Sequence, residues 1–191
     1  QNITYIPHFL SAVVLVSILQ MLFNPHSGVV NMVLKALGQP VANLMIMPGA
    51  FKPMYVLSGL WQNLGWDSIL YIAALVGIDS SLYEAATIDG ASRFRKMINI
   101  SLPSIAPTII IMLLLRCGQI MNIGYEKILL MQNPLNMASS DVISTFVYRS
   151  GILEADYSFS TAVGLFNSIC NFILLIVANT ISRRVGDTSL W

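Results

Sequence analysis

Four apolar segments separated by polar intervals dominate the chain. They cover residues 6–23, 54–78, 102–122 and 161–182. Each is close to the roughly 17–25 residues that an α-helix needs to cross the hydrocarbon core of a bilayer. The pattern predicts an all-α polytopic membrane protein with four transmembrane helices in this chain, forming a single domain over residues 1–191.

Shorter segments lie between these predicted spans. Residues 29–37 are amphipathic and end at Gly38, which predicts a helix lying at the membrane interface. Prolines 40, 48 and 53 are expected in the connection that follows. Residues 141–150 carry apolar positions at helical spacing, so we expect a second short helix folded onto the bundle.

The polar interval 79–101 carries helix signals of its own. Ser81 and Glu84 have the spacing of a capping box at the start of a short helix. Gly90 favours the left-handed turn that ends such a helix. A second short helix is expected over residues 92–99, and Pro103 is expected to begin the next span. The interval therefore predicts two short helices joined by a tight turn.

Composition supports the membrane assignment and excludes several functions. Of 191 residues, 55% are hydrophobic and 10% charged, and mean hydropathy is +0.71. Soluble domains carry about 25% charged residues. A net charge of +1 gives no reason to expect nucleic-acid binding. Cys117 and Cys170 lie in apolar segments and two histidines form no cluster with them, so we expect no metal site.

Charge distribution predicts the orientation. Arg183 and Arg184 end the last span, and three basic residues lie in the 79–101 interval. The two longer intervals on the other side hold Lys35, Lys52, Lys127 and Arg149, spread over many more residues. Short loops rich in Lys and Arg remain in the cytoplasm. An even number of spans places both chain ends and the 79–101 loop on that side.

The loop also carries a motif. Glu84-Ala85-Ala86, then Gly90, Ile100 and Leu102-Pro103, with Asp89 and Ala91 flanking the glycine, resembles the "EAA" motif of binding-protein-dependent ABC importer permeases. The segment from Tyr5 through Gly65-Trp66, and the ending Arg183-Arg184 to Leu190-Trp191, are similar to the oligo- and polysaccharide-uptake branch. The resemblance implies a MetI-like permease bundle in a bacterial cell membrane. Since that branch carries further spans upstream and the sequence lacks an initial Met, we expect N-terminal spans to be missing.

The resemblance also implies partners. These are cytoplasmic ABC ATPase subunits that bind ATP and Mg²⁺, a second permease subunit, an extracellular substrate-binding protein, a carbohydrate substrate and the lipid bilayer. No cofactor is expected in this chain. The residues implied in coupling to the ATPase are Glu84, Ala85, Ala86, Asp89, Gly90, Ala91, Ile100, Leu102 and Pro103.

Polar residues in or beside the spans are candidates for a translocation pathway, because sugar hydroxyls exchange hydrogen bonds with amides and occasional charges. These are Gln62, Asn63, Asp67, Arg116, Gln119, Asn122, Asn167 and Asn171. Hydrogen bonding between helices is the alternative role for each amide. Arg116, Gln119 and Asn122 are expected on one helix face. Arg116 could line the pathway, snorkel to the interface or pair with Asp67.

The sequence carries no Walker-type phosphate loop and no nucleophile–base pair, so we expect no enzyme activity in this chain. ATP hydrolysis is expected on a separate subunit. A passive channel or facilitator, and a membrane scaffold without transport, are the alternative functions.

Overall fold

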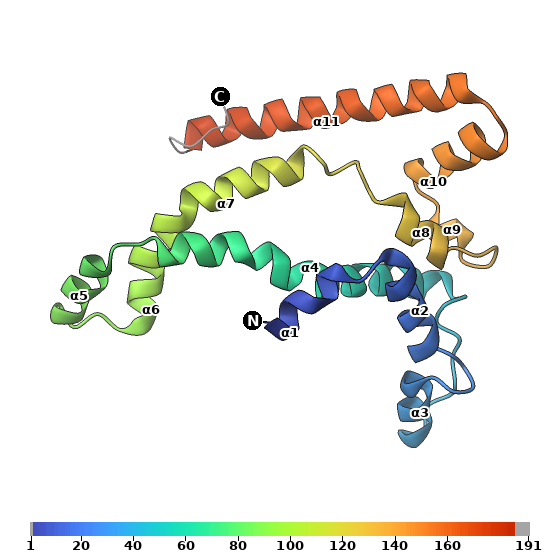
Figure 1. Cartoon of the computed structure of the whole chain (residues 1–191), viewed down its shortest axis with the longest axis horizontal. Helices are drawn as coiled ribbons and strands as arrows, with labels where there is room; N and C mark the ends of the chain where they lie inside the picture. The colour runs from blue at the N-terminus through green and yellow to red at the C-terminus, as the bar shows by residue number, and fades with distance from the viewer. Residues whose placement is uncertain (1, 186–191) are drawn as a thin grey trace. The chain divides into compact units, whose positions relative to one another are not determined.

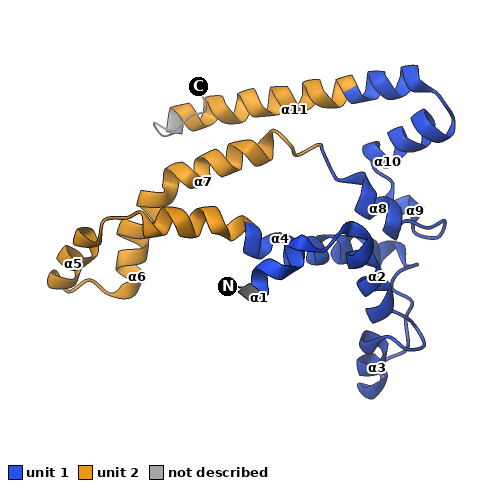
Figure 2. Cartoon of the chain, in the orientation of Figure 1, with its two compact units in different colours: residues 1–66, 122–164 blue, residues 67–121, 165–191 orange. Residues whose placement is uncertain are grey.

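A computed structural model describes residues 2–185, and every regular element in that range is helical (Figure 1). The Leu190-Trp191 ending that contributed to the resemblance lies outside the described residues. The chain divides into two compact units (Figure 2). Unit 1 comprises residues 1–66 and 122–164, and unit 2 comprises residues 67–121 and 165–191.

Unit 1 is built from many short helices around one apolar core. Its elements are α1 (Asn2–Tyr5), the 3₁₀ turn η1 (Ile6–Phe9), α2 (Ala12–Leu22), α3 (Val29–Ala36), the first part of α4 (Pro48–Val76), α8 (Tyr125–Met131), α9 (Met137–Ser140), α10 (Ile143–Tyr148), the π turn η3 (Arg149–Leu153) and the start of α11 (Tyr157–Val185). Val16, Leu19, Phe51, Met54, Ile128 and Met131 form the buried core. The core therefore joins α2, α4 and α8.

The predicted first span, 6–23, is not a straight helix. The helical segments Ile3–Phe9 and Ala12–Leu22 are separated by a bend of 111°. Leu10 and Ser11 adopt extended backbone angles, and the Ser11 hydroxyl accepts a hydrogen bond from the Val14 N–H at 3.3 Å. Ser11 is thus the N-cap of a new helix, a position at which serine is one of the preferred residues. The mostly apolar sequence on both sides of Ser11 concealed this start, and α2 alone is only about 16 Å long.

Buried amides fix the connections of unit 1. Asn31, on α3, donates to the carbonyls of Phe23 and Asn24 and accepts from the Ala42 N–H. Asn136 is fully buried and donates to the carbonyls of Met45 and Met131. Because a buried amide is costly unless its hydrogen bonds are satisfied, these contacts select one loop conformation.

The short predicted helices have mixed outcomes. The interval 29–37 does form α3, and Gly38 follows it with φ +72°. The expected helix 141–150 begins at Ile143 and widens into the π turn η3. Two of the three expected connection prolines were wrongly assigned: Pro48 begins α4, and Pro53 lies inside it. At the first helical residue, Pro48, the missing N–H has no helical acceptor to lose, whereas Pro53 is the sixth residue and removes one hydrogen bond of the helix.

Unit 2 contains α5 (Ser80–Ile88), α6 (Arg93–Lys96), the π turn η2 (Met97–Ser101) and α7 (Leu102–Cys117), with the later parts of α4 and α11. The predicted capping box is wrong. Asp79 is the N-cap of α5, and its side chain accepts from the Ser81 N–H at 2.9 Å. Ser81 lies inside the helix, because the chain turns helical two residues earlier than the Ser/Glu spacing suggested.

The predicted separation of the second short helix from the third span is also wrong. Residues Arg93–Cys117 form one helical segment of 25 residues, with η2 inside it. Pro103 lies just beyond this π turn. It lacks the N–H that would reach the carbonyl four residues earlier, so the helix widens there instead of ending.

The helical segment ends at Cys117, earlier than the predicted 122. Gly118 is its C-cap, and residues 118–121 form a turn. The sequence predicted that Arg116, Gln119 and Asn122 share one helix face. This is wrong, because Gln119 and Asn122 lie beyond the end of the helix. The second and fourth predicted segments correspond to longer helices than expected, α4 and α11.

Two helical segments are long and apolar enough to cross a membrane on their own: Arg93–Cys117 and Tyr157–Arg183. Two bent pairs pass the same criterion only when each pair is taken together. One is the first segment described above, and the other joins α4 to α5 with a bend of 67°. The described residues therefore contain two clear spans, or up to four if each bent pair counts as one.

Candidate functional site

The motif residues of the 79–101 loop lie on α5 and the turn that ends it. Glu84, Ala85 and Ala86 occupy the middle of α5. Gly90 has φ +72°, and the N–H groups of Gly90 and Ala91 donate to the carbonyls of Thr87 and Ala86. These two bonds define a Schellman motif, which requires a left-handed residue at the glycine position. Asp89 is the C-cap, so the predicted role of Gly90 in the turn is confirmed.

The remaining motif residues lie on the helical segment that follows. Ile100 is in η2, and Leu102 and Pro103 form the first turn of α7. The motif thus spans two antiparallel helical arms, α5 and α6–η2–α7. Figure 2 shows both arms within unit 2.

One face of α5 is left uncovered. Glu84 and Ala85 are exposed, and Ile88 is 88% exposed. The Glu84 side chain has no hydrogen bond or ion pair within the described chain. The predicted capping role of Glu84 is therefore wrong. An isoleucine so fully exposed beside a small alanine suits a surface that another protein covers. Ile88 was not among the coupling residues that the motif implied, although its position three residues after Ala85 places both on one face.

The start of α5 is held electrostatically. Asp79 accepts the Ser81 backbone N–H, and hydrogen bonding from Ser81 lowers the pKa of the Asp79 carboxyl. The carboxylate also lies at the positive end of the helix dipole. The cap therefore stays ionised and fixes where α5 begins.

Two side-chain bridges join α5 to the other arm. The hydroxyls of Tyr83 and Ser101 share a hydrogen bond of 2.9 Å. Lys96 Nζ donates to Thr87 Oγ1 at 2.6 Å, and the Thr87 hydroxyl donates to the Tyr83 carbonyl at 2.6 Å. The loop is therefore a cross-linked hairpin.

Arg116 and Asp67 form the ion pair that the sequence offered as one of three roles for Arg116. Their nearest atoms, Nη2 and Oδ1, lie 2.7 Å apart. The side chains are 62% and 40% exposed, so neither is buried within this chain. The pair joins α7 to the part of α4 that lies in unit 2.

The candidate pathway amides Gln62, Asn63 and Asn171 have hydrogen-bond partners within their own unit. Gln62 Nε2 donates to the Leu10 carbonyl at 2.9 Å, where the bend leaves that group without a helical partner. Asn63 Oδ1 lies 3.1 Å from His8 Nδ1. Asn171, which is 6% exposed, accepts from the Met121 N–H at 3.1 Å.

The other candidate amides lie in different settings. Gln119 and Asn122 are exposed in and after the turn that follows α7, and Asn167 is half-buried on α11. Within each unit, Gln62 and Asn63 are adjacent on α4, and Asp67 meets Arg116.

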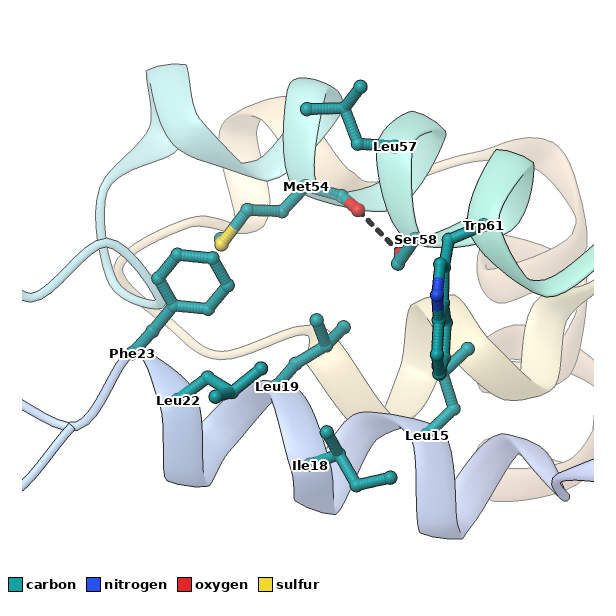
Figure 3. Close-up of a pocket in the computed structure, with 9 residues that line it drawn as sticks. All are labelled: Leu15, Ile18, Leu19, Leu22, Phe23, Met54, Leu57, Ser58 and Trp61. Atoms are coloured by element: carbon teal, nitrogen blue, oxygen red, sulfur yellow. Dashed lines mark hydrogen bonds between the residues drawn. The ribbon is translucent and has the colours of Figure 1, made fainter. Parts of the chain in front are cut away.

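An apolar cavity lies between α2 and α4 in unit 1 (Figure 3). Its volume is about 360 Å³, and Leu15, Phe23, Met54 and Trp61 are among the residues that line it. Its one hydroxyl, on Ser58, donates to the Met54 carbonyl within the same helix. The cavity therefore suits an apolar group. It offers a sugar almost no hydrogen-bond partner.

Comparison with known families decides the class of protein. The family described as "binding-protein-dependent transport system inner membrane component" matches residues 1–187. The chain belongs to this family. The resemblance inferred from the EAA motif is thereby confirmed, and the chain is a membrane permease component of the MetI-like fold.

Curated relatives of this chain include one whose name describes polysaccharide transport. The chain is 41% identical over 191 residues to "Protein LplB" of Bacillus subtilis (strain 168). It is 35% identical to the "polygalacturonan/rhamnogalacturonan transport system permease protein YteP" of the same organism. Each alignment covers 100% of the chain and 60% of the relative. The permease chain therefore spans about 60% of the length of these relatives.

A solved structure shares the permease fold. It is the crystal structure of a bacterial alginate ABC transporter in complex with an alginate pentasaccharide-bound periplasmic protein. The match has a TM-score of 0.95 and 39% sequence identity, and covers 99% of this chain and 66% of the other.

Proposed function

We propose that this chain is the permease subunit of an ATP-driven importer that carries oligosaccharides across a bacterial cell membrane. The cytoplasmic ATPase subunits that power it are separate chains, and they bind the ATP and Mg²⁺. A second permease subunit, identical or homologous, completes the pathway. An extracellular binding protein delivers the sugar. Each bent helix pair counts as one span, which gives four spans in this chain.

The uncovered face of α5 is the single observation that carries this proposal. A polar helix with exposed Ala85 and Ile88 has no role in a passive bundle, but it suits docking into a cleft of another protein. The alanines let the partner approach the helix backbone. Glu84, without a partner in the described chain, is available to a basic residue of the ATPase.

The coupling step follows from the continuity of the other arm. Residues Arg93–Cys117 form one helical segment from the hairpin into the apolar segment that spans the membrane. When the ATPases close on ATP, they push the docked α5. The push moves α7 as a rigid body, and the bundle changes between inward- and outward-facing states.

The family and its relatives support a carbohydrate substrate, since the matched permeases carry polysaccharide-transport names. The polar residues in or beside the spans are the proposed lining of the pathway. Asp67 and Arg116 supply the charges, and Gln119, Asn122 and Asn167 supply amides. Gln62, Asn63 and Asn171 form hydrogen bonds inside their own units and serve first to hold the helices.

Replacement of the docking surface tests the proposal. The Ala85→Glu/Ala86→Glu double variant should insert into the membrane but lose both the co-purifying ATPase subunits and sugar uptake. Ala36→Glu, at an exposed helix position on α3, is the matched control and should retain both. Uptake at the normal rate in the double variant would contradict the proposal and favour a passive facilitator.

A further inference from the structure

The π turn η2 has a geometric consequence for the hairpin. In an α-helix of about 3.6 residues per turn, side chains five residues apart point about 140° away from each other. A π turn closes its hydrogen bonds between residues five apart, and so brings such side chains onto one face. Here the Leu102 N–H donates to the Met97 carbonyl, which is this π pattern.

Lys96 and Ser101 are five residues apart: Lys96 immediately precedes this turn, and Ser101 is its last residue. Both contact α5, and the residues they contact, Thr87 and Tyr83, are four apart on one face of that helix. In a regular α-helix the Ser101 hydroxyl would turn away from Tyr83. The π turn is therefore what allows both bridges to form together.

From this alignment we propose that Tyr83 and Ser101 are positioning residues that lock α5 to α7 and transmit its movement. This rests on the proposed function, since transmission needs an ATPase that moves α5. The Thr87–Lys96 bridge holds the hairpin at its turn, and the Tyr83–Ser101 bridge holds it where α7 begins. With both bridges in place, a push on α5 cannot be absorbed by opening of the hairpin.

Both side chains of the lock are half-buried, whereas Glu84 and Ala85 on the docking face are exposed. The hydroxyls thus point to the inside of the hairpin and away from the face proposed for the ATPase. Loss of either hydroxyl should leave docking intact and weaken transmission alone. This separates the lock from the docking surface experimentally.

The test uses the complete transporter in proteoliposomes and compares Tyr83→Phe, Ser101→Ala and their combination with the wild type. Two quantities are measured: the amount of ATPase that co-purifies, and the number of ATP molecules hydrolysed per sugar imported. Each single variant should keep the ATPase and raise the ATP-per-sugar ratio about threefold to tenfold, the scale of one neutral hydrogen bond. The double variant should be no worse than either single variant, because both changes break the same contact.

Three variants serve as controls. Ser101→Thr retains a hydroxyl and should restore the wild-type ratio. Ser104→Ala and Tyr157→Phe remove hydroxyls from exposed residues and should leave it unchanged. Unchanged ratios in both single variants, additive effects in the double variant, or loss of the ATPase would overturn the lock. Wild-type uptake without ATP would overturn the proposed function with it, whereas normal wild-type coupling beside unaffected variants would overturn the lock alone.

Discussion

Arg116 Nη2 lies 2.7 Å from Asp67 Oδ1, so the cation in the last turn of α7 is neutralised by a carboxylate of α4. The pair explains how an apolar helix carries an arginine, because unpaired charges near the hydrocarbon region are costly. It also holds the end of α7 that lies away from the α5–α6 hairpin.

A double-mutant cycle measures this pair. Arg116→Ala and Asp67→Ala should each lower thermal stability in detergent, with a coupling energy of about 0.2–1 kcal/mol, the range for exposed pairs. Exchange of the two charges, Arg116→Asp with Asp67→Arg, should recover part of the loss. Arg95→Ala, at an exposed arginine, should be additive with Asp67→Ala. Additivity of the Arg116 and Asp67 variants would disprove the interaction.

The second prediction concerns the exposed Ile88 of α5 and its contribution to ATPase binding. Ile88→Glu should weaken binding of the ATPase by about 2 kcal/mol or more, as expected for a central apolar contact of an interface. Titration of purified permease with the ATPase subunit measures the affinity. Val41→Glu, at a residue that is 50% exposed in unit 1, is the control. Equal affinities of the Ile88 variant and the wild type would place the docking face elsewhere.

The two left-handed glycines provide a matched pair. Gly90 and Gly38 both have φ +72°, and a Cβ at either position would meet no atom within 4 Å. Alanine at either site should therefore cost only the backbone strain, about 1–2 kcal/mol. Thermal unfolding should show similar losses for both, but only Gly90→Ala should reduce sugar uptake, because it alone distorts the hairpin. Equal uptake by the two variants would argue against a role of the turn in coupling.

The partly buried Lys127 should make the stability of the folded chain depend on pH. Its Nζ donates to the Tyr55 carbonyl at 3.2 Å, and burial lowers the pKa of the Lys127 ammonium to about 8. In an unfolded chain the pKa of a lysine is about 10.4. Between these values the unfolded chain binds more protons than the folded one, so stability should rise as pH increases from about 8 towards 10.

Unfolding in detergent across this pH range checks the sign. Lys127→Met should abolish the part of the rise that Lys127 causes, whereas Lys35→Met, at an exposed lysine, should retain it. A Lys127→Met profile identical to that of the wild type would contradict the assignment.

Local sequence signals predicted the features that depend on few residues. The helix ending at Gly38, the turn at Gly90 and the EAA hairpin all follow from glycine, alanine and charge patterns. The ion pair was one of three roles weighed for Arg116, and similar predicted depth in neighbouring spans made it geometrically reasonable.

Other features depended on partners that sequence spacing does not reveal. The bend at Ser11 is stabilised by Gln62, which binds the Leu10 carbonyl from 52 residues away. Asn136 is buried because its amide reaches Met45, 91 residues earlier. Pro103 suggested a helix start, but it lies in a continuous helical segment, just after a π turn whose Ser101 hydroxyl is hydrogen-bonded to Tyr83 of α5.

Uptake of a labelled oligosaccharide into proteoliposomes tests the central claim most directly. The vesicles contain the permease with its ATPase subunits, the binding protein is supplied on the opposite face, and ATP is present or absent on the ATPase side. Uptake should require ATP in the wild type and be lost in the Ala85→Glu/Ala86→Glu variant even with ATP present. Equal uptake with and without ATP, or normal ATP-driven uptake in that variant, would contradict the claim that α5 receives the work of ATP hydrolysis.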